Sequence, residues 1–187
     1  MFHQINLILD RYDLEVFDIY TNEMNGGSIR LYISHKNSKY KIKTRKLQKI
    51  VSMEKKILKN PSIAFNKFKK NINQSKDSLV KLIKTLISKN KNIHIYGAST
   101  KGNVILQFCN INNKLIKYAA DRNPDKIGKK TPGSNIRIIS EKVSRNINPD
   151  YYLVMPWHFK KEFISREKKF LKKGGKFIFP LPKLKIH

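Results

Sequence analysis

The chain has 187 residues, 40% of them hydrophobic and 10% aromatic, so it is long and apolar enough to bury a core and is not a disordered segment. We expect no membrane span and no secretory leader, and the single cysteine excludes an internal disulfide and predicts a cytoplasmic location. The net charge of +27 comes from 33 Lys and only 7 Arg against 13 acidic residues, and because Arg is the usual reader of bases and phosphates, a nucleic-acid-binding module is the less favoured alternative.

The first 35 residues differ in charge from the rest of the chain, with two Arg and five acids giving a net charge of −3. Apolar periodicity predicts a helix over residues 3–11, a strand over 14–20, a turn region over 22–27 and a second strand over 29–33. One short helix and a hairpin are marginally stable in water. We therefore expect residues 1–35 to be the remnant of a larger sheet.

Residues 36–90 hold seventeen Lys and Arg against two acids, a net charge of +15, and are predicted to form a basic helical connector. One helix is expected after Pro61. A second is expected to begin at Ser75, whose side chain is a suitable N-cap, with Asp77 in the favourable first turn.

From residue 91 short apolar strands alternate with helices, which is typical of a mainly parallel sheet covered on both faces. The predicted strands are 93–96, 115–120, 152–155 and 177–179, and the predicted helices are 101–110 and 159–172. Cys109 lies on the apolar stripe of the first of these helices, so we expect a buried, unreactive thiol. The predicted fold class is α/β, with a Rossmann-like domain over 91–187 preceded by the helical segment and the hairpin remnant.

The turn after the first of these strands predicts a phosphate site. A small-residue turn that opens a helix exposes backbone N–H groups and the positive end of the helix dipole. Hydroxyl and ammonium groups in the turn add donors and charge. The residues expected to bind are Gly97, Ser99, Thr100, Lys101, Gly102 and Asn103. The spacing is neither a GxGxxG nor a Walker motif, so the turn alone is weak evidence.

Two further polar clusters come after predicted strands. Asp121 and Asn123 come after the next strand, and Asp121 lies twenty-four residues after Gly97, near the spacing of a ribose-binding acid. Trp157 and His158 come after a later strand and are expected to line the same pocket. Asp121 capping a loop and Trp157 serving only for packing are the alternatives. The residues alone thus predict a phosphate- or nucleotide-binding α/β domain, with no metal site and no defined reaction.

Several long motifs resemble the C-terminal domain of the SAM-dependent sugar C-methyltransferases. They are Tyr96-Gly-Ala-Ser-Thr-Lys-Gly-Asn103, Ala120-Asp-Arg-Asn-Pro-Asp-Lys126, Gly128 with Thr131-Pro-Gly133, Pro149 to Phe159, and Gly174 to Pro182. Arg11 to Asp18 and Asn25 to Tyr32 also resemble the last hairpin of the family's SAM-binding sheet, although many members carry His where this chain has Asn25.

The resemblance implies a chain that binds a nucleotide-linked keto-deoxysugar, such as a dTDP-sugar. Full-length members also have a zinc-binding segment, a SAM-binding domain and a Glu-His motif associated with general-base chemistry, and the sequence shows none of these. We therefore expect a fragment, a split subunit or a non-catalytic companion of a SAM-binding chain. We expect no SAM on this chain alone and no turnover by it, and at most an auxiliary hydrogen-bond donor at His158.

Overall fold

The computed structural model describes residues 1–24 and 27–187, so the position of Asn25 lies outside the described residues. The chain divides into two compact units, Met1–Lys69 and Lys70–His187. The division into segments at 1–35, 36–90 and 91–187 stays a prediction. Among the helices of the described residues, none is both long and apolar enough to cross a membrane.

The first unit contains α1 (Phe2–Asp10), the hairpin strands β1 (Leu14–Asn22) and β2 (Ser28–His35), and α2 (Thr44–Lys59). The strands pair antiparallel from Leu14 opposite His35 to Asn22 opposite Ser28, which confirms the predicted hairpin. The backbone N–H groups of Phe2 and His3 donate to the carboxylate of Glu54 at 2.6 and 3.0 Å, so a side chain of α2 caps the start of α1.

The core of the first unit is small. Its buried hydrophobic side chains are Phe2, Val16 and Ile19, and α2 has no fully buried residue. Many large apolar side chains of this unit are exposed instead. They include Leu7, Ile8, Tyr12, Tyr20, Ile29, Tyr32 and Ile33. The expectation that the hairpin is the remnant of a larger sheet stays a prediction.

A single helix, α3 (Pro61–Ser88), occupies the place where two helices were predicted. The start after Pro61 is confirmed, but Ser75 as an N-cap is wrong, because its hydroxyl donates to the carbonyl of Asn71 one turn earlier, at 2.9 Å. Hydroxyls in helices commonly form this back-bond, so an N-cap residue type is not by itself a helix start. Leu79 and Ile83, in the later part of α3, are buried in the core of the second unit.

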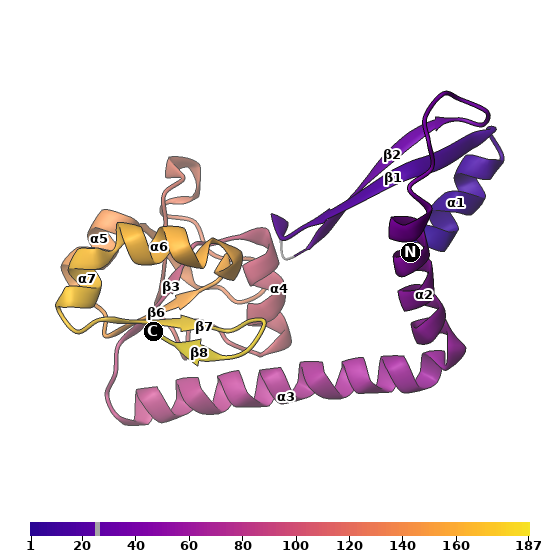
Figure 1. The fold of residues 1–187 in the computed structure, drawn as a ribbon. Helices are drawn as coiled ribbons and strands as arrows, with labels where there is room; N and C mark the ends of the chain where they lie inside the picture. The colour runs from indigo at the N-terminus through magenta and orange to yellow at the C-terminus, as the bar shows by residue number, and fades with distance from the viewer. Residues whose placement is uncertain (25–26) are drawn as a thin grey trace. The chain divides into compact units, whose positions relative to one another are not determined.

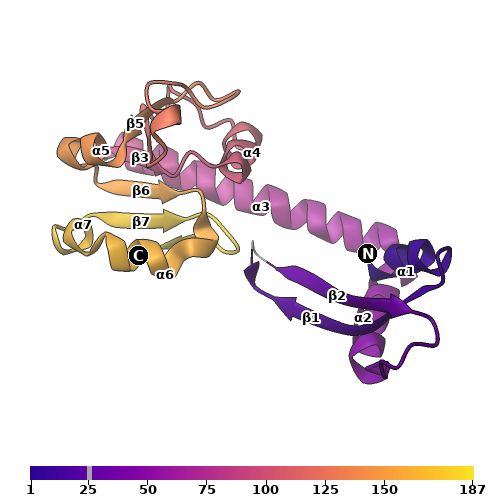
Figure 2. The same cartoon turned by 90° about the horizontal axis from the view of Figure 1, so that it is seen from above.

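The second unit is built on a six-stranded sheet with the order β5-β4-β3-β6-β7-β8. Its strands are β3 (Ile93–Tyr96), β4 (Tyr118–Asp121), β5 (Arg137–Ser140), β6 (Tyr151–Val154), β7 (Lys176–Phe179) and β8 (Lys185–Ile186). The first five run parallel, as β6 and β7 show where they lie side by side in Figure 2. Strand order reverses between β3 and β6, which confirms the predicted Rossmann-like α/β fold.

Helices cover both faces of this sheet (Figure 1). On one face the later part of α3 and helix α4 (Thr100–Phe108) pack on apolar strand residues such as Ile95 and Leu153. On the other face lie α5 (Glu141–Ile147), α6 (Lys160–Arg166) and α7 (Lys168–Lys172). Tyr96 and Tyr152 belong to the aromatic core of this second face. Alternate strand residues thus face opposite cores, as the strand pleat requires.

Four details of the second unit differ from the sequence-based expectations. β4 starts three residues late, because Leu115 and Ile116 donate their N–H groups to the carbonyl of Asn112 in a turn. Strand β5 and helix α5 were missed, although Ser140, the N-cap of α5, is a start signal. The helix expected over 159–172 is interrupted, because the backbone of Glu167 leaves helical geometry (φ −101°, ψ 30°).

The fourth difference is at the end of the sheet. Strand 177–179 was expected to close the sequence, but β8 comes after it and pairs antiparallel, with Ile178 opposite Ile186. Two residues with exposed side chains make a strand too short for alternation to reveal.

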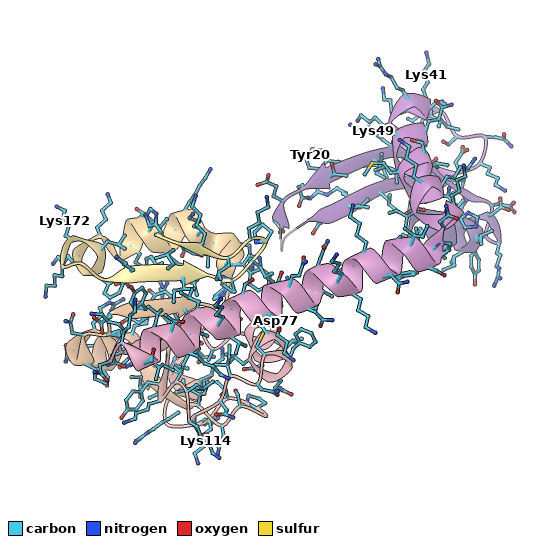
Figure 3. All side chains as sticks on the ribbon, turned by 90° about the horizontal axis from the view of Figure 1, so that it is seen from below. Tyr20, Lys41, Lys49, Asp77, Lys114 and Lys172 are labelled. Carbon is cyan, nitrogen blue, oxygen red and sulfur yellow. The ribbon has the colours of Figure 1, made fainter. Side chains whose placement is uncertain are left out.

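The exposed lysine side chains extend their charged ends into the solvent. The side chains of Lys114 and Lys172 point away from the second unit (Figure 3), and both residues are exposed.

Cys109 is buried, and burial raises the pKa of its thiol, as expected of an unreactive cysteine.

A buried histidine lies beneath α5. The His94 side chain is fully buried, its Nδ1 lies 2.8 Å from the Ser144 hydroxyl, and that hydroxyl lies 2.9 Å from the hydroxyl of Tyr152. Among the described residues its Nε2 has no hydrogen-bond partner. Burial lowers the pKa of His94 from 6.5 to about 4, so the folded chain holds this imidazole neutral.

This burial predicts acid sensitivity. Unfolding releases His94 to its ordinary pKa, so the unfolded chain binds the extra proton and the free energy of unfolding falls as the pH falls from 6.5 towards 4, by up to roughly 3 kcal/mol. We expect urea unfolding, monitored by the fluorescence of Trp157, to show this slope in the unmodified chain. His94→Gln removes the titrating ring and flattens the slope between pH 6.5 and 5, whereas the exposed control His3→Gln keeps it. An unchanged slope in His94→Gln would contradict the assignment.

Candidate functional site

The glycine turn after β3 has the backbone that the sequence predicted. Gly97 has a φ of +82°, a conformation that favours glycine, and a Cβ at this position would lie 2.7 Å from Cγ of Pro156, just after β6. The N–H of Gly97 donates to the carbonyl of Ala120 at 2.8 Å. The turn is thus held close to the ends of both neighbouring strands.

The helix after the turn is capped by Ser99, whose Oγ accepts from the N–H of Gly102 at 3.1 Å. Gly102 is buried against β6, and a Cβ there would lie 2.5 Å from Cβ of Met155. Thr100 and Lys101 are exposed in the first turn of α4. A helix start with small residues and a basic side chain therefore lies at the carboxyl edge of the sheet, as predicted.

Asp121 braces the glycine turn from the end of β4. Its Oδ2 accepts from the N–H of Ala98 at 2.8 Å and from Nζ of Lys126 at 3.2 Å, and its Oδ1 accepts from the N–H of Asn123 at 2.8 Å. Asn123 in turn caps the next short helix, accepting from the N–H of Asp125 at 2.9 Å. These hydrogen bonds are the ones expected if Asp121 caps the loop, which was the alternative to ribose binding. Binding of a ribose or base by Asp121 and Asn123 stays a prediction.

Trp157 and His158 begin a 3-10 helix, Trp157–Phe159, after β6. Trp157 packs against the aromatic core of the second face, in agreement with the packing alternative. Burial, and secondarily the charge of Lys101, lower the pKa of His158. Its Nδ1 and Oδ1 of Asn103 are buried atoms without a hydrogen-bond partner among the described residues. Such groups are the ones that a bound ligand or water satisfies.

A cavity of about 380 Å³ opens at the carboxyl edge of the sheet. It is lined by Tyr96, Gly97, Ser99, Asp121, Arg122, Glu141, Pro156, Phe159, Glu162, Phe163 and Arg166. Of the predicted site residues, Gly97, Ser99 and Asp121 line it. The other predicted residues do not line it: four lie in the first turns of α4, Asn123 follows β4, and Trp157 and His158 lie in the 3-10 helix after β6. The cavity thus lies where strand order reverses, at the usual ligand position of this fold.

The charged wall of the cavity escaped sequence analysis. Tyr96 donates its hydroxyl proton to Oε1 of the buried Glu167 at 2.7 Å and accepts from Nη2 of Arg166 at 2.6 Å. Arg166 Nη2 also donates to Oε1 of Glu141 at 2.8 Å. Arg145 joins the two acids, donating through Nε to Glu167 at 3.0 Å and through Nη2 to Glu141 at 2.8 Å.

This network fixes the charge state of its members. Burial raises the pKa of Tyr96 far above its ordinary value, so the phenol stays protonated and donates. Burial would raise the pKa of Glu167 as well, but its bonds from Arg145 and Tyr96 outweigh burial and hold that pKa below the ordinary value. The one sign of this network in the sequence was Glu141, an acidic residue at the start of a helix. The hydrogen-bond partners of Tyr96, Arg166 and Glu167, lie 70 and 71 residues further along the chain, so local pattern could not reveal them.

Among the described residues no group of three His, Cys, Asp or Glu side chains is placed to hold a metal ion.

Comparison with known proteins gives one family. Residues 23–182 match the family described as C-methyltransferase C-terminal domain. The chain is also 27% identical over 179 residues to the C-methyltransferase NovU of Streptomyces niveus. That alignment covers 96% of this chain and 42% of NovU, so the chain spans less than half the length of this curated relative.

The network around Tyr96 makes a prediction for stability. Tyr96→Phe removes one hydroxyl and leaves the buried Glu167 carboxylate one donor short, so the free energy of unfolding is expected to fall by about 1–3 kcal/mol. Urea unfolding at neutral pH, monitored by Trp157 fluorescence, measures it. Tyr118→Phe, on the neighbouring strand β4, is the matched control outside this network and should change stability by less than about 0.5 kcal/mol. Equal effects of the two changes would refute the role given to the hydroxyl.

Proposed function

The chain belongs to the C-methyltransferase C-terminal domain family, and from this premise we propose that it is the nucleotide-sugar-binding part of a SAM-dependent C-methyltransferase acting on a nucleotide-linked keto-deoxysugar. The observation that carries the proposal is the cavity beside the glycine turn, at the point where strand order reverses. This is where a fold of this type binds nucleotides.

The diphosphate of the ligand is assigned to the start of α4. The N-terminal N–H groups of this helix, the hydroxyls of Ser99 and Thr100 and the ammonium of Lys101 together offer donors and positive charge. Gly97 and Gly102 allow the turn to pack closely on Pro156 and Met155, which brings the start of α4 to the carboxyl edge of the sheet.

The nucleoside is assigned to the loops beside this turn. Asp121 and Asn123, at the end of β4 and just after it, are proposed to bind the ribose or base, with Trp157 and His158 on the opposite loop. The lowered pKa of His158 favours its neutral imidazole, which can donate one hydrogen bond and accept another. The unpartnered Nδ1 supports a ligand contact there.

The reaction itself requires groups beyond this chain's cavity. In methylation of a carbon next to a ketone, a base would take up the α-proton, and SAM would supply the methyl group to the enolate carbon and leave as S-adenosylhomocysteine. Donors near the ketone stabilise the enolate, and His158 is proposed as an auxiliary donor of this kind, not as the base. The base and SAM are assigned to the SAM-binding part of the enzyme.

That part is proposed to cover the hairpin of the first unit. The unit buries only a few side chains and leaves the apolar groups of β1 and β2 exposed, so a further sheet would gain apolar burial and strand pairing by docking there. The partner is either the remainder of a longer protein, in keeping with the 42% coverage of NovU, or a separate SAM-binding chain.

Titration calorimetry tests the binding role. The chain is expected to bind dTDP, and Lys101→Ala to weaken that binding by roughly ten- to a hundredfold, because one charge-assisted hydrogen bond contributes about 1.5–3 kcal/mol. Lys161→Ala, an exposed lysine on α6, is the control and should leave the dissociation constant unchanged. A folded chain, as judged by circular dichroism, that binds no dTDP at millimolar concentration would exclude the proposal.

A second experiment separates binding from catalysis. Incubated with SAM and a dTDP-linked keto-deoxysugar, the chain alone is expected to give no methylated product in mass spectrometry, because the base and the SAM site are assigned elsewhere. Product should form when the SAM-binding part of a family member is added. Methyl transfer by the chain alone would show that this division of roles is wrong.

A further inference from the structure

The cavity at the carboxyl edge differs in character from the start of α4 beside it. We propose that the cavity holds an uncharged polar ring of the nucleotide-sugar, with Arg166 as its hydrogen-bond donor and Phe159 as its apolar wall, and that the diphosphate stays outside it at the helix start. This inference rests on the proposed function and adds a division of the site into two parts. Arg166 and Phe159 are assigned to the ligand from the geometry alone.

The charge of the lining does not favour a diphosphate. Three carboxylates line the cavity, those of Asp121, Glu141 and Glu162, against the two guanidinium groups of Arg122 and Arg166. Lys126 pairs with Asp121, and Arg145 pairs with Glu141 and with the buried Glu167, so the lining and these partners together are formally neutral. The cavity therefore offers no net positive charge to a diphosphate, whereas its carboxylates can accept hydrogen bonds from the hydroxyls of an uncharged ring.

Arg166 is held in one orientation with donors to spare. Its Nε and Nη2 lie 3.2 and 2.6 Å from the hydroxyl of Tyr96, and Nη2 also donates to Glu141. Nη1 forms an ion pair with the exposed Glu162 carboxylate at 3.6 Å, a distance too long for a hydrogen bond. The guanidinium therefore reaches the cavity already oriented, with its outer nitrogen available to an acceptor on a ligand.

The other wall is apolar and partly solvent-exposed. Phe159 is 49% exposed although it lines the cavity, and its ring centroid lies 6.2 Å from that of Phe163. Pro156 completes this wall. An exposed phenyl ring beside an oriented donor is a suitable surface for the face of a pyrimidine or a hexose. The pyrimidine and the hexose both fit this description. Comparing dTDP, which carries only the base, with dTDP-glucose, which carries both rings, shows which of them the cavity binds.

The test is calorimetric titration of the whole chain with dTDP-glucose, dTDP and inorganic pyrophosphate. Phe159→Ala is expected to weaken binding of dTDP-glucose about tenfold, and Arg166→Lys, which keeps the charge but loses the fork, by a similar factor. If the cavity holds the base, both changes weaken dTDP and dTDP-glucose equally. If it holds the hexose, only dTDP-glucose is weakened. In both cases pyrophosphate binding is unchanged.

Matched controls are Phe108→Ala, whose ring is 44% exposed on α4, and Arg137→Lys, which is exposed on β5, and both should bind all three ligands as the unmodified chain does. Phe159 is half-exposed and makes no hydrogen bond in the network around Tyr96, so Phe159→Ala is expected to fold. This variant therefore tests the inference even if Arg166→Lys fails to fold. Unchanged affinities in Phe159→Ala, or an equal loss of pyrophosphate binding, would overturn the inference while leaving the proposed function intact. Absence of any dTDP binding by the unmodified chain would instead remove both.

Discussion

The close approach of the glycine turn to the end of β6 is the constraint on which the candidate site depends. A Cβ at Gly97 would meet Pro156, and a Cβ at Gly102 would meet Met155, at distances that real Cβ atoms do not adopt. Because both glycines are present, α4 starts against the central strands of the sheet and directs its N–H groups to the carboxyl edge. Asp121 then ties the turn to β4, so three strand ends meet around one cavity.

The second organising interaction is the ion network around Tyr96 on the other face of the sheet. It joins β3, α5, α6 and α7 through the buried carboxylate of Glu167. A buried carboxylate without partners would lower the free energy of unfolding considerably, so these bonds hold the helices in place. The interruption between α6 and α7 falls at this residue. The same network that stabilises the helical layer also orients Arg166 at the cavity, so the packing of these helices fixes the position of a cavity side chain.

The two units differ in how well each buries its own apolar surface. The second unit has two continuous cores, one on each face of its sheet, with fully buried strand residues such as Ile95 and Tyr152. Among its described residues the first unit has a core of three buried hydrophobic side chains, and its sheet has two strands. Since two strands are marginal alone, the first unit gains less stability from its own packing than the second.

Local pattern in the sequence determined the hairpin, the parallel α/β domain and the glycine turn, because strand alternation, helical periodicity and a small-residue turn are properties of neighbouring residues. It did not determine β5, β8 or the single helix α3, where short strands and an internal serine give ambiguous signals. Nor did it reveal Arg166 and Glu167 beside Tyr96, because hydrogen bonds between residues some seventy positions apart form only when the sheet and its covering helices are assembled. The sequence thus determined the glycine turn at the edge of the sheet, and the tertiary structure decided which side chains surround the cavity beside it.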